Sequence, residues 1–285
     1  MRMEPVERAA AVLSRTSAAR FRDPYHCFDW PSRPEPDRLA MSRPLISLAA
    51  HPIWETLTDE QRWRAALLET AAFFSLNVAG ERELMIGLAA RLHHGTLAPA
   101  SEYLLHFIQE ECAHSAVFTR FCRIYAGRLY PDRQVRLPRK YLAGEEEFLF
   151  FAQVLVFEQL AGWHNAQNAH DAEVWALPRA IHEYHAEEEA RHVAFGRTVV
   201  EALWNAHSPG WGEEGRAQVA GYLRRYLEAL HRLYVSPFVY RDLGLADPMG
   251  LRAQVLALPA RQQVQRDASA RVLAFLGRLP GLVLA

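Results

Sequence analysis

Three potential metal ligands fall on one side of a single predicted helix, in the segment HAEEEARH at 185–192. At about 100° per residue, the side chains of His185, Glu189 and His192 lie within roughly 60° of one another around the helix axis. Two imidazoles and a carboxylate so close together are unfavourable in an apolar core, whereas a metal ion binds such donors well. The segment therefore predicts a metal site.

Two further stretches place acids inside helices that otherwise read as buried. Glu111 and His114 form a second Glu-x-x-His pair, and they interrupt an apolar helical stripe. Glu158 lies in the middle of FFAQVLVFEQLAGW, where an unpaired charge would be costly unless something compensates it. These residues are expected to be metal ligands, although a surface acid is the alternative for each.

The first long helix offers three acids. Glu81 shares its stripe with apolar residues and is the best-placed candidate, while Glu69 and Glu83 lie on displaced faces and stay open as alternatives. Glu110, Glu187 and Glu188 face beside or away from the predicted stripes and are not expected to bind metal. The predicted ligand set is Glu81, Glu111, His114, Glu158, His185, Glu189 and His192.

The order of these residues is that of a two-metal site. A Glu, a Glu-x-x-His, a second Glu and a second Glu-x-x-His follow one another, as in di-iron carboxylate proteins built on helical bundles. Four carboxylates neutralise most of the charge of two divalent ions, and bridging carboxylates can hold two metals together. Oxygen ligands with two or three imidazoles favour iron or manganese.

Helical periodicity places these residues on four helices, at about 59–93, 101–125, 144–170 and 172–206. Thr58 begins the first with a helix-start signal, Ser101 is the expected N-cap of the second, and Gly127 its expected stop. A fifth helix is expected at about 213–235, and weaker ones near 248–257 and 260–278. Strand signals are scarce, so the predicted fold class is all-α, a bundle of long helices.

Two regions are expected along the chain. Residues 1–50 read as a proline-rich, partly ordered N-terminal extension, because five prolines between 21 and 44 exclude a continuous helix there. Residues 51–285 are expected to form a single helical domain.

Bulk properties exclude several classes of protein. The net charge of −1 gives no basic excess for nucleic acid, and no apolar run is long enough for a membrane span. The N-terminus lacks the apolar region of a secretory signal. Three cysteines without paired spacing predict reduced thiols and a cytoplasmic location.

The pattern His-x-x-x-Glu-x-x-His, the interval from Glu158 to His185 and the run EEARH at 188–192 resemble the AurF-type arylamine N-oxygenases, over about residues 60–240. The resemblance implies a ferritin-like di-iron bundle with additional terminal segments. It also implies two iron ions, with manganese as a substitute, O2 as co-substrate, and His185 as an added imidazole on one iron. A possible homodimer follows from the same resemblance.

The implied activity is oxygenation of an arylamine or amino-acid-derived amine to a hydroxylamine, nitroso or nitro product, through a peroxo-bridged di-ferric species, in natural-product biosynthesis. No flavin or Fe–S motif is present, so an external reductase or ferredoxin is expected. Arg191 is a candidate to orient a ligating carboxylate, with a surface ion pair as the alternative. Four apolar residues are expected to line the pocket or the core: Phe74, Phe107, Phe151 and Leu155.

Three other functions are weighed against this one. The same metals could serve a C–H hydroxylase or desaturase. A ferritin-like iron oxidase or storage protein is less favoured, because the chain exceeds a minimal four-helix cage subunit and because His185 suits a tuned oxidant better than iron transit. A purely structural bundle is disfavoured by its buried acids.

Overall fold

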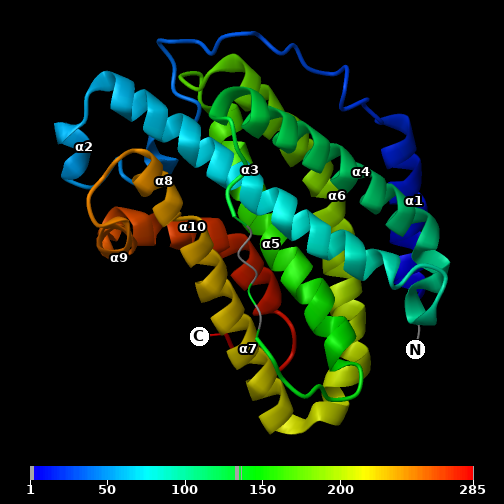
Figure 1. Ribbon diagram of the computed structural model, residues 1–285. Coiled ribbons are helices and arrows are strands. Elements are labelled where there is room, and N and C mark those ends of the chain that lie inside the picture. Colours follow the sequence, from blue (N-terminus) through cyan, green and yellow to red (C-terminus); the bar gives the residue numbers. More distant parts are fainter. Residues whose placement is uncertain (1–2, 132–134, 136, 285) are drawn as a thin grey trace.

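Helices form nearly all of the regular structure of this protein (Figure 1). The computed structural model describes residues 3–131, 135 and 137–284. Within these ranges the one β contact is an isolated bridge between Leu39 and Val174, which confirms the predicted all-α class. None of the helices described here combines the length and the apolar character that crossing a membrane requires.

Four long helices carry the predicted ligands. They are α3 (Asp59–Ala89), α4 (Ser101–Phe121), α5 (Glu145–His170) and α6 (Ala176–His207). Helix α3 packs mainly against α4, and α5 packs mainly against α6, so the bundle consists of two helix pairs (Figure 1). The predicted ends agree with the observed ends to within a few residues.

Local capping signals account for most of these ends. The Thr58 hydroxyl accepts a bond from the Gln61 backbone N–H at 3.2 Å, and the Gln61 side chain accepts one from the Thr58 N–H at 2.9 Å, which makes a capping box at the start of α3. After α4 and a short π-helical turn (Cys122–Ala126), Gly127 ends the helix with φ 70°, as predicted.

The prediction that Ser101 caps α4 was wrong. A 3-10 helix (Gly95–Ala100) runs directly into α4, so Ser101 already has helical backbone angles, φ −57° and ψ −33°. Its hydroxyl instead accepts a hydrogen bond from the backbone N–H of His93 at 2.8 Å. The serine therefore stabilises the connection before the helix.

The remaining helices cover the bundle. Helix α1 (Glu4–Ala19) packs on α4 and α6, within the segment expected to be an extension, while residues 21–42 contain no helix. Helices α7 (Gly212–Leu233) and α10 (Pro259–Leu276) pack on α5. Helices α2 (Ile53–Thr56), α8 (Pro237–Asp242) and α9 (Pro248–Ala257) lie at one end. The division at residue 50 stays a prediction.

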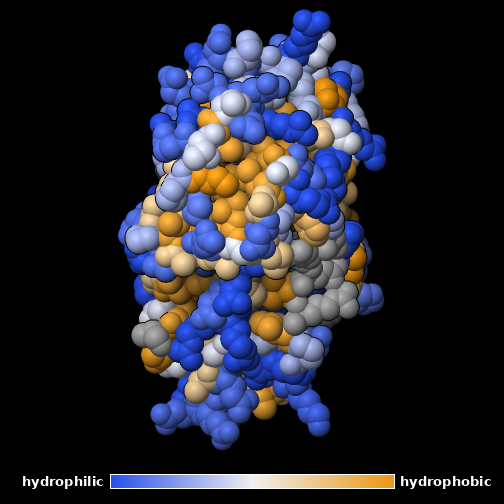
Figure 2. All heavy atoms as spheres, turned by 60° about the vertical axis from the view of Figure 1, so that its left-hand side comes forward, coloured by the Kyte–Doolittle hydropathy of each residue, from blue (hydrophilic) through white to orange (hydrophobic). Residues whose placement is uncertain are grey.

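Apolar side chains reach the surface on the side that carries α2, α8 and α9 (Figure 2). In α9 Met249 is exposed, and in and after α8 the residues Phe238, Leu243 and Leu245 are partly buried. Hydrophilic side chains predominate above and below this apolar area in the same view (Figure 2).

Two glycines bring α3 close to α5. A Cβ atom on Gly80 would overlap the ring of Phe157, and one on Gly87 would overlap the ring of Phe150. The glycines and the phenylalanines are both seven residues apart, which is two helical turns, so each glycine receives one ring. The close approach holds the Glu81 turn of α3 against the Glu158 turn of α5.

Buried apolar residues form two clusters, and the polar residues lie between them. Along α4, Phe107 belongs to one cluster and Phe118 to the other; along α3, Leu84 and Phe74 divide in the same way. The predicted ligands of these helices lie in the interval between the apolar residues. The packing therefore leaves a band of buried polar side chains across the middle of the bundle.

Candidate metal centre

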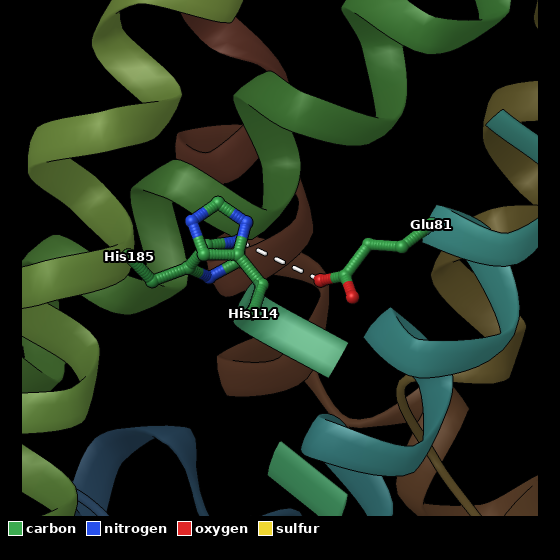
Figure 3. A group of neighbouring side chains, drawn as sticks. All are labelled: Glu81, His114 and His185. Carbon is green, nitrogen blue, oxygen red and sulfur yellow. Dashed lines mark ion pairs between the residues drawn. The ribbon is translucent and has the colours of Figure 1, made fainter. Parts of the chain in front are cut away.

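All seven predicted ligands come together in this band, in two groups whose donor atoms lie within 4.8 Å of one another. Glu81, His114 and His185 form the first group and reach toward one another from three helices (Figure 3). Every one of the seven side chains is buried, with at most 2% of its surface exposed. The second group consists of Glu111, Glu158, Glu189 and His192.

Glu81 is the acid of α3 that joins the site. Glu69, one of its two alternatives, instead accepts hydrogen bonds from the backbone and side chain of Ser47. Glu83, the other, lies beside Arg82 on the surface. The Ser115 hydroxyl donates a hydrogen bond of 2.6 Å to Glu81, which orients this carboxylate from α4.

Glu111 and Glu189 occupy the centre of the site. Nδ1 of His114 lies 3.4 Å from a Glu111 oxygen and 3.6 Å from a Glu189 oxygen. Nδ1 of His192 lies 2.9 Å and 3.4 Å from the other oxygens of the same two carboxylates. Each carboxylate therefore lies between the two imidazoles, as a ligand shared by two ions must.

Several of the potential metal-binding atoms have no hydrogen-bond partner within the described residues. At least one oxygen of Glu81, of Glu111 and of Glu158 has no hydrogen bond, nor does either oxygen of Glu189 or the Nδ1 atom of His192. His192 Nδ1 thus lies close to Glu111 without forming a hydrogen bond to it. Buried polar atoms normally have hydrogen-bond partners, so a group of carboxylate and imidazole atoms without partners fits the binding of two metal ions.

The outer nitrogens of the two Glu-x-x-His imidazoles are held reciprocally. His114 Nε2–H donates to Glu188 at 2.9 Å, and His192 Nε2–H donates to Glu110 at 2.8 Å. Each motif thus supplies the acid that orients the imidazole of the other motif. These bonds direct both Nδ1 atoms toward the central carboxylates, so that each imidazole can offer Nδ1 to a metal once it has lost the proton there.

Arg191 links the two outer acids. Its guanidinium contacts Glu110 at 2.6 Å and Glu188 at 3.5 Å, and it also donates to the Ser17 hydroxyl on α1. Arg191 is buried and so does not form the surface ion pair considered as an alternative. Nor does it touch a predicted ligand carboxylate: it orients the acids that hold the imidazoles.

His185 is held by hydrogen bonds through Asn165 rather than by a glutamate on its outer nitrogen. Its Nε2 atom lies 2.7 Å from a Glu189 oxygen, and its Nδ1 accepts a hydrogen bond of 2.6 Å from the amide of Asn165. The oxygen of that amide accepts a bond of 2.8 Å from His182 Nδ1. A buried chain of three side chains therefore fixes the third imidazole.

The four predicted apolar residues are all buried, and they have different neighbours. Phe107 stacks on the His192 ring, with 3.7 Å between centroids, and so shields one side of the site. Phe74 stacks on Phe118, while Phe151 packs in the core near Phe195. Leu155 packs in the same core, next to Gly196.

A cavity of about 390 Å³ lies between α3, α5 and α7, and none of these four residues lines it. Its walls are mostly apolar and include Leu76, Phe150 and Tyr226. They also include Gly80 and Phe157, the chain neighbours of Glu81 and Glu158. The cavity therefore runs beside the metal site, along the contact between α3 and α5.

Burial and mutual repulsion shift the pKa values of the carboxylates. Burial raises the pKa of Glu81 well above its usual value, and the nearby Glu111 raises it further. Burial likewise raises the pKa of Glu189. Burial opposes the ionisation of Glu111 too, but the charges of His192 and His114 outweigh it and lower the pKa of Glu111 to about 2. Of these three carboxylates, Glu111 therefore keeps its negative charge most readily in the metal-free site.

The imidazoles divide in the same way. Burial disfavours a charged His114, but hydrogen bonds to Glu111 and Glu188 outweigh that effect and raise its pKa to about 10. Burial lowers the pKa of His185 well below its usual value, and His114 lowers it further. In the metal-free protein, protons therefore occupy places that metal ions would take.

The seven predicted ligands lie together, and their role as ligands stays a prediction; Glu110 and Glu188 were not expected to bind metal. They are not among the clustered donors, yet both are buried and both bind an imidazole. Their position directly before Glu111 and Glu189 was the available signal: the same dipeptide, Glu-Glu, begins both motifs.

One acid from each of two helices, and Glu-x-x-His from each of the other two, is the arrangement of the ferritin-like di-iron carboxylate class. A family model described as P-aminobenzoate N-oxygenase AurF matches residues 4–279, nearly the whole chain. The protein belongs to this AurF family of di-iron oxygenases and is an oxidoreductase, as the resemblance implied. A comparison with proteins of curated function gave no match.

Proposed function

We propose that this protein is an O2-dependent di-iron N-oxygenase that converts an amine to a hydroxylamine and onward to a nitroso or nitro product. The observation that carries the proposal is the buried constellation of four carboxylates and three imidazoles, in a chain whose family model is named for an arylamine N-oxygenase. The substrate is proposed to be an arylamine or an amino-acid-derived amine, used in natural-product biosynthesis.

The proposed ligands divide between two ions. Glu81, His114 and His185 would hold one ion, Glu158 and His192 the other, and Glu111 and Glu189 would be shared. Oxygen donors with a minority of imidazoles suit iron, and manganese as a substitute, better than metals that prefer thiolates. No cysteine belongs to either group.

When bound, the two metals supply the redox chemistry that activates O2. Conversion of an amine to a hydroxylamine inserts one oxygen atom into an N–H bond and reduces the other to water, and it consumes two electrons and two protons. An external reductase or ferredoxin is proposed to provide the electrons, because the sequence carries no motif for a flavin or an Fe–S cluster.

The polypeptide contributes positioning and exclusion of water. Glu110 and Glu188 each bind the Nε2 atom of one imidazole and so direct its Nδ1 atom toward the central carboxylates, and Phe107 covers His192. The apolar cavity beside Gly80 and Phe157 is proposed to receive the organic part of the amine. The seven buried ligands leave little room for bulk water near a reactive oxidant.

The test is product analysis with purified protein loaded with iron and reduced. Candidate amines are incubated with ¹⁸O2, and the expected result is ¹⁸O in a hydroxylamine, nitroso or nitro product. Oxygen incorporation only at carbon would overturn the N-oxygenase assignment in favour of C–H hydroxylation. A homodimer, expected from the family resemblance, is checked separately by light scattering.

The ligand assignment has its own test. Glu158→Ala is expected to reduce the iron content below two ions per chain, because it removes one of the four carboxylates. Glu146→Ala, at an exposed acid on the same helix, is the matched control and is expected to retain both ions. Full retention of iron by Glu158→Ala would remove Glu158 from the ligand set.

A further inference from the structure

A second buried polar cluster lies apart from the metal ligands, around a cavity of about 20 Å³. Three residues of its wall have a buried polar atom without a hydrogen-bond partner: His164 at Nε2, Tyr234 at its hydroxyl and Arg261 at Nε. His164 and Arg261 are at most 5% exposed. Unpaired buried groups of this kind are costly, and several around one cavity point to a ligand.

The hydrogen bonds of His164 define what it needs from such a ligand. Its Nδ1–H donates to the Leu160 carbonyl at 2.8 Å, and burial, with Arg261 adding to it, lowers its pKa to about 3. The ring is therefore neutral, and Nε2 carries a lone pair rather than a hydrogen. His164 can only accept a hydrogen bond from a ligand.

Arg261 needs the opposite. Its guanidinium stays charged in the protein and contains donors only, one of which binds the Leu45 carbonyl at 3.3 Å. Glu69, in the wall of the same cavity, offsets part of this charge when its carboxyl is ionised, and burial raises the pKa of that carboxyl to about 7. A carboxylate ligand would place its lone pairs against the lone pair of His164 Nε2, whereas a neutral group with both a donor and an acceptor pairs with His164 and with Arg261.

The cavity lies in a suitable position relative to the metal site. His164 is six residues beyond Glu158 on α5, which is roughly 9 Å along the helix axis. Leu76 and Leu233 line both this cavity and the large apolar cavity beside Glu81 and Glu158. An aromatic amine with its nitrogen beside the metals would reach His164 with the group at its opposite end.

We infer that this small cavity binds the end of the amine substrate remote from its nitrogen, and that this end is a neutral group that both donates and accepts hydrogen bonds. A primary carboxamide or a hydroxyl group has this chemistry, and a cavity of about 20 Å³ would receive only the terminal polar atoms of either group. His164 accepts from the group, and Arg261 and Tyr234 donate to it. The inference rests on the proposed function, because it takes the ligand to be the substrate.

The experiment measures binding without turnover. Iron-loaded, reduced protein is kept free of O2, and equilibrium dialysis gives the dissociation constants of 4-aminobenzamide, 4-aminobenzoate and aniline. The amide is expected to bind at least about tenfold more tightly than either of the others, because it alone pairs with both His164 and Arg261. Equal or tighter binding of 4-aminobenzoate would overturn the inference.

Two conservative variants locate the effect. Tyr234→Phe removes only a hydroxyl and is expected to weaken amide binding about five- to tenfold while aniline is unaffected. His164→Phe removes the acceptor and is expected to narrow the preference for amide over carboxylate. Tyr125→Phe, outside the cavity, is the matched control and should bind all three as the unmodified protein does. An unchanged ratio in both cavity variants would overturn the inference.

Product analysis of the same amines separates this inference from the proposed function. Tight, Tyr234-dependent binding of the amide without any oxygenated product would leave the cavity assignment standing and refute the N-oxygenase proposal. Oxygenation of all three amines with no preference among them would support the N-oxygenase proposal and refute the cavity assignment.

Discussion

Replacement of Glu110 by Gln tests whether an acid outside the ligand set controls metal binding. The Glu110 carboxylate accepts from two donors, His192 Nε2 at 2.8 Å and the Arg191 guanidinium at 2.6 Å. Glutamine keeps the shape but has one oxygen and one NH2 group, so one of the two donors must face another donor. The change therefore loosens the imidazole or leaves the buried guanidinium short of a partner.

The magnitude follows from these two contacts. Loss of the acid that orients a metal-binding imidazole typically reduces metal affinity about 10- to 100-fold, which is about 1.4 to 2.7 kcal/mol. Loss of one hydrogen bond to a charged group costs the fold about 1.5 to 3 kcal/mol. For a domain of this size, that destabilisation lowers the melting temperature by roughly 3 to 8 °C.

Two measurements check the prediction. Competition with a chromophoric chelator under anaerobic conditions gives the affinity for Fe(II) or Mn(II), and thermal unfolding is followed with and without metal. Glu183→Gln, at an exposed acid of α6, is the control and should change neither. Glu188→Gln should weaken metal binding through His114 but destabilise the fold less, because Arg191 lies 3.5 Å from Glu188. Wild-type affinity and melting temperature in Glu110→Gln would refute the reasoning.

Three further predictions concern pH and packing. Because the pKa of His114 is raised to about 10, a metal ion that binds at neutral pH must displace the proton of this imidazole. The affinity for Mn(II) should therefore rise about tenfold per pH unit for each displaced proton. Equal affinities at pH 6.5 and pH 8 would contradict this prediction. Burial raises the pKa of Glu69 from 4.5 to about 7, so the folded state holds a proton on Glu69 that the unfolded state loses, and the free energy of unfolding should fall as pH rises from 4.5 to 7. In Glu69→Gln, urea unfolding at pH 5 and pH 8 should show a smaller fall in this free energy. A fall equal to that of the unmodified protein would count against the prediction. Gly80→Ala should destabilise the fold by about 1 to 3 kcal/mol, because the new Cβ would overlap the ring of Phe157. Gly162→Ala is the control, because a Cβ atom at Gly162 would meet no atom within 4 Å. Equal melting temperatures of the two variants would refute the packing argument.

Helical periodicity was enough to predict the four ligand helices. A helix buried along one stripe repeats its apolar residues every three or four positions, and an acid within that stripe stands out, as Glu158 does. The ends were less certain where neighbouring structure intervened. Ser101 has the chemistry of an N-cap, but the preceding 3-10 helix already sets its backbone angles.

Contacts between distant segments were beyond prediction. Glu110 and Glu188 lie beside the stripes of their own helices, and their value arises only because they reach imidazoles 82 and 74 residues away. Side-chain type also left open whether Phe74, Phe107, Phe151 and Leu155 line the pocket or the core: all four are buried, and none of them lines the large cavity beside α3 and α5.

The sequence by itself determined the helices, the ligand types and their order, because helix geometry is local and a buried carboxylate or imidazole carries its chemistry with it. Only the tertiary structure decided which acid of α3 joins the site, how the two motifs orient each other, and that Arg261, Glu69 and His164 surround one cavity. Those outcomes depend on the distances between the helix axes and on the angles at which the helices cross. No single segment of the chain contains that information.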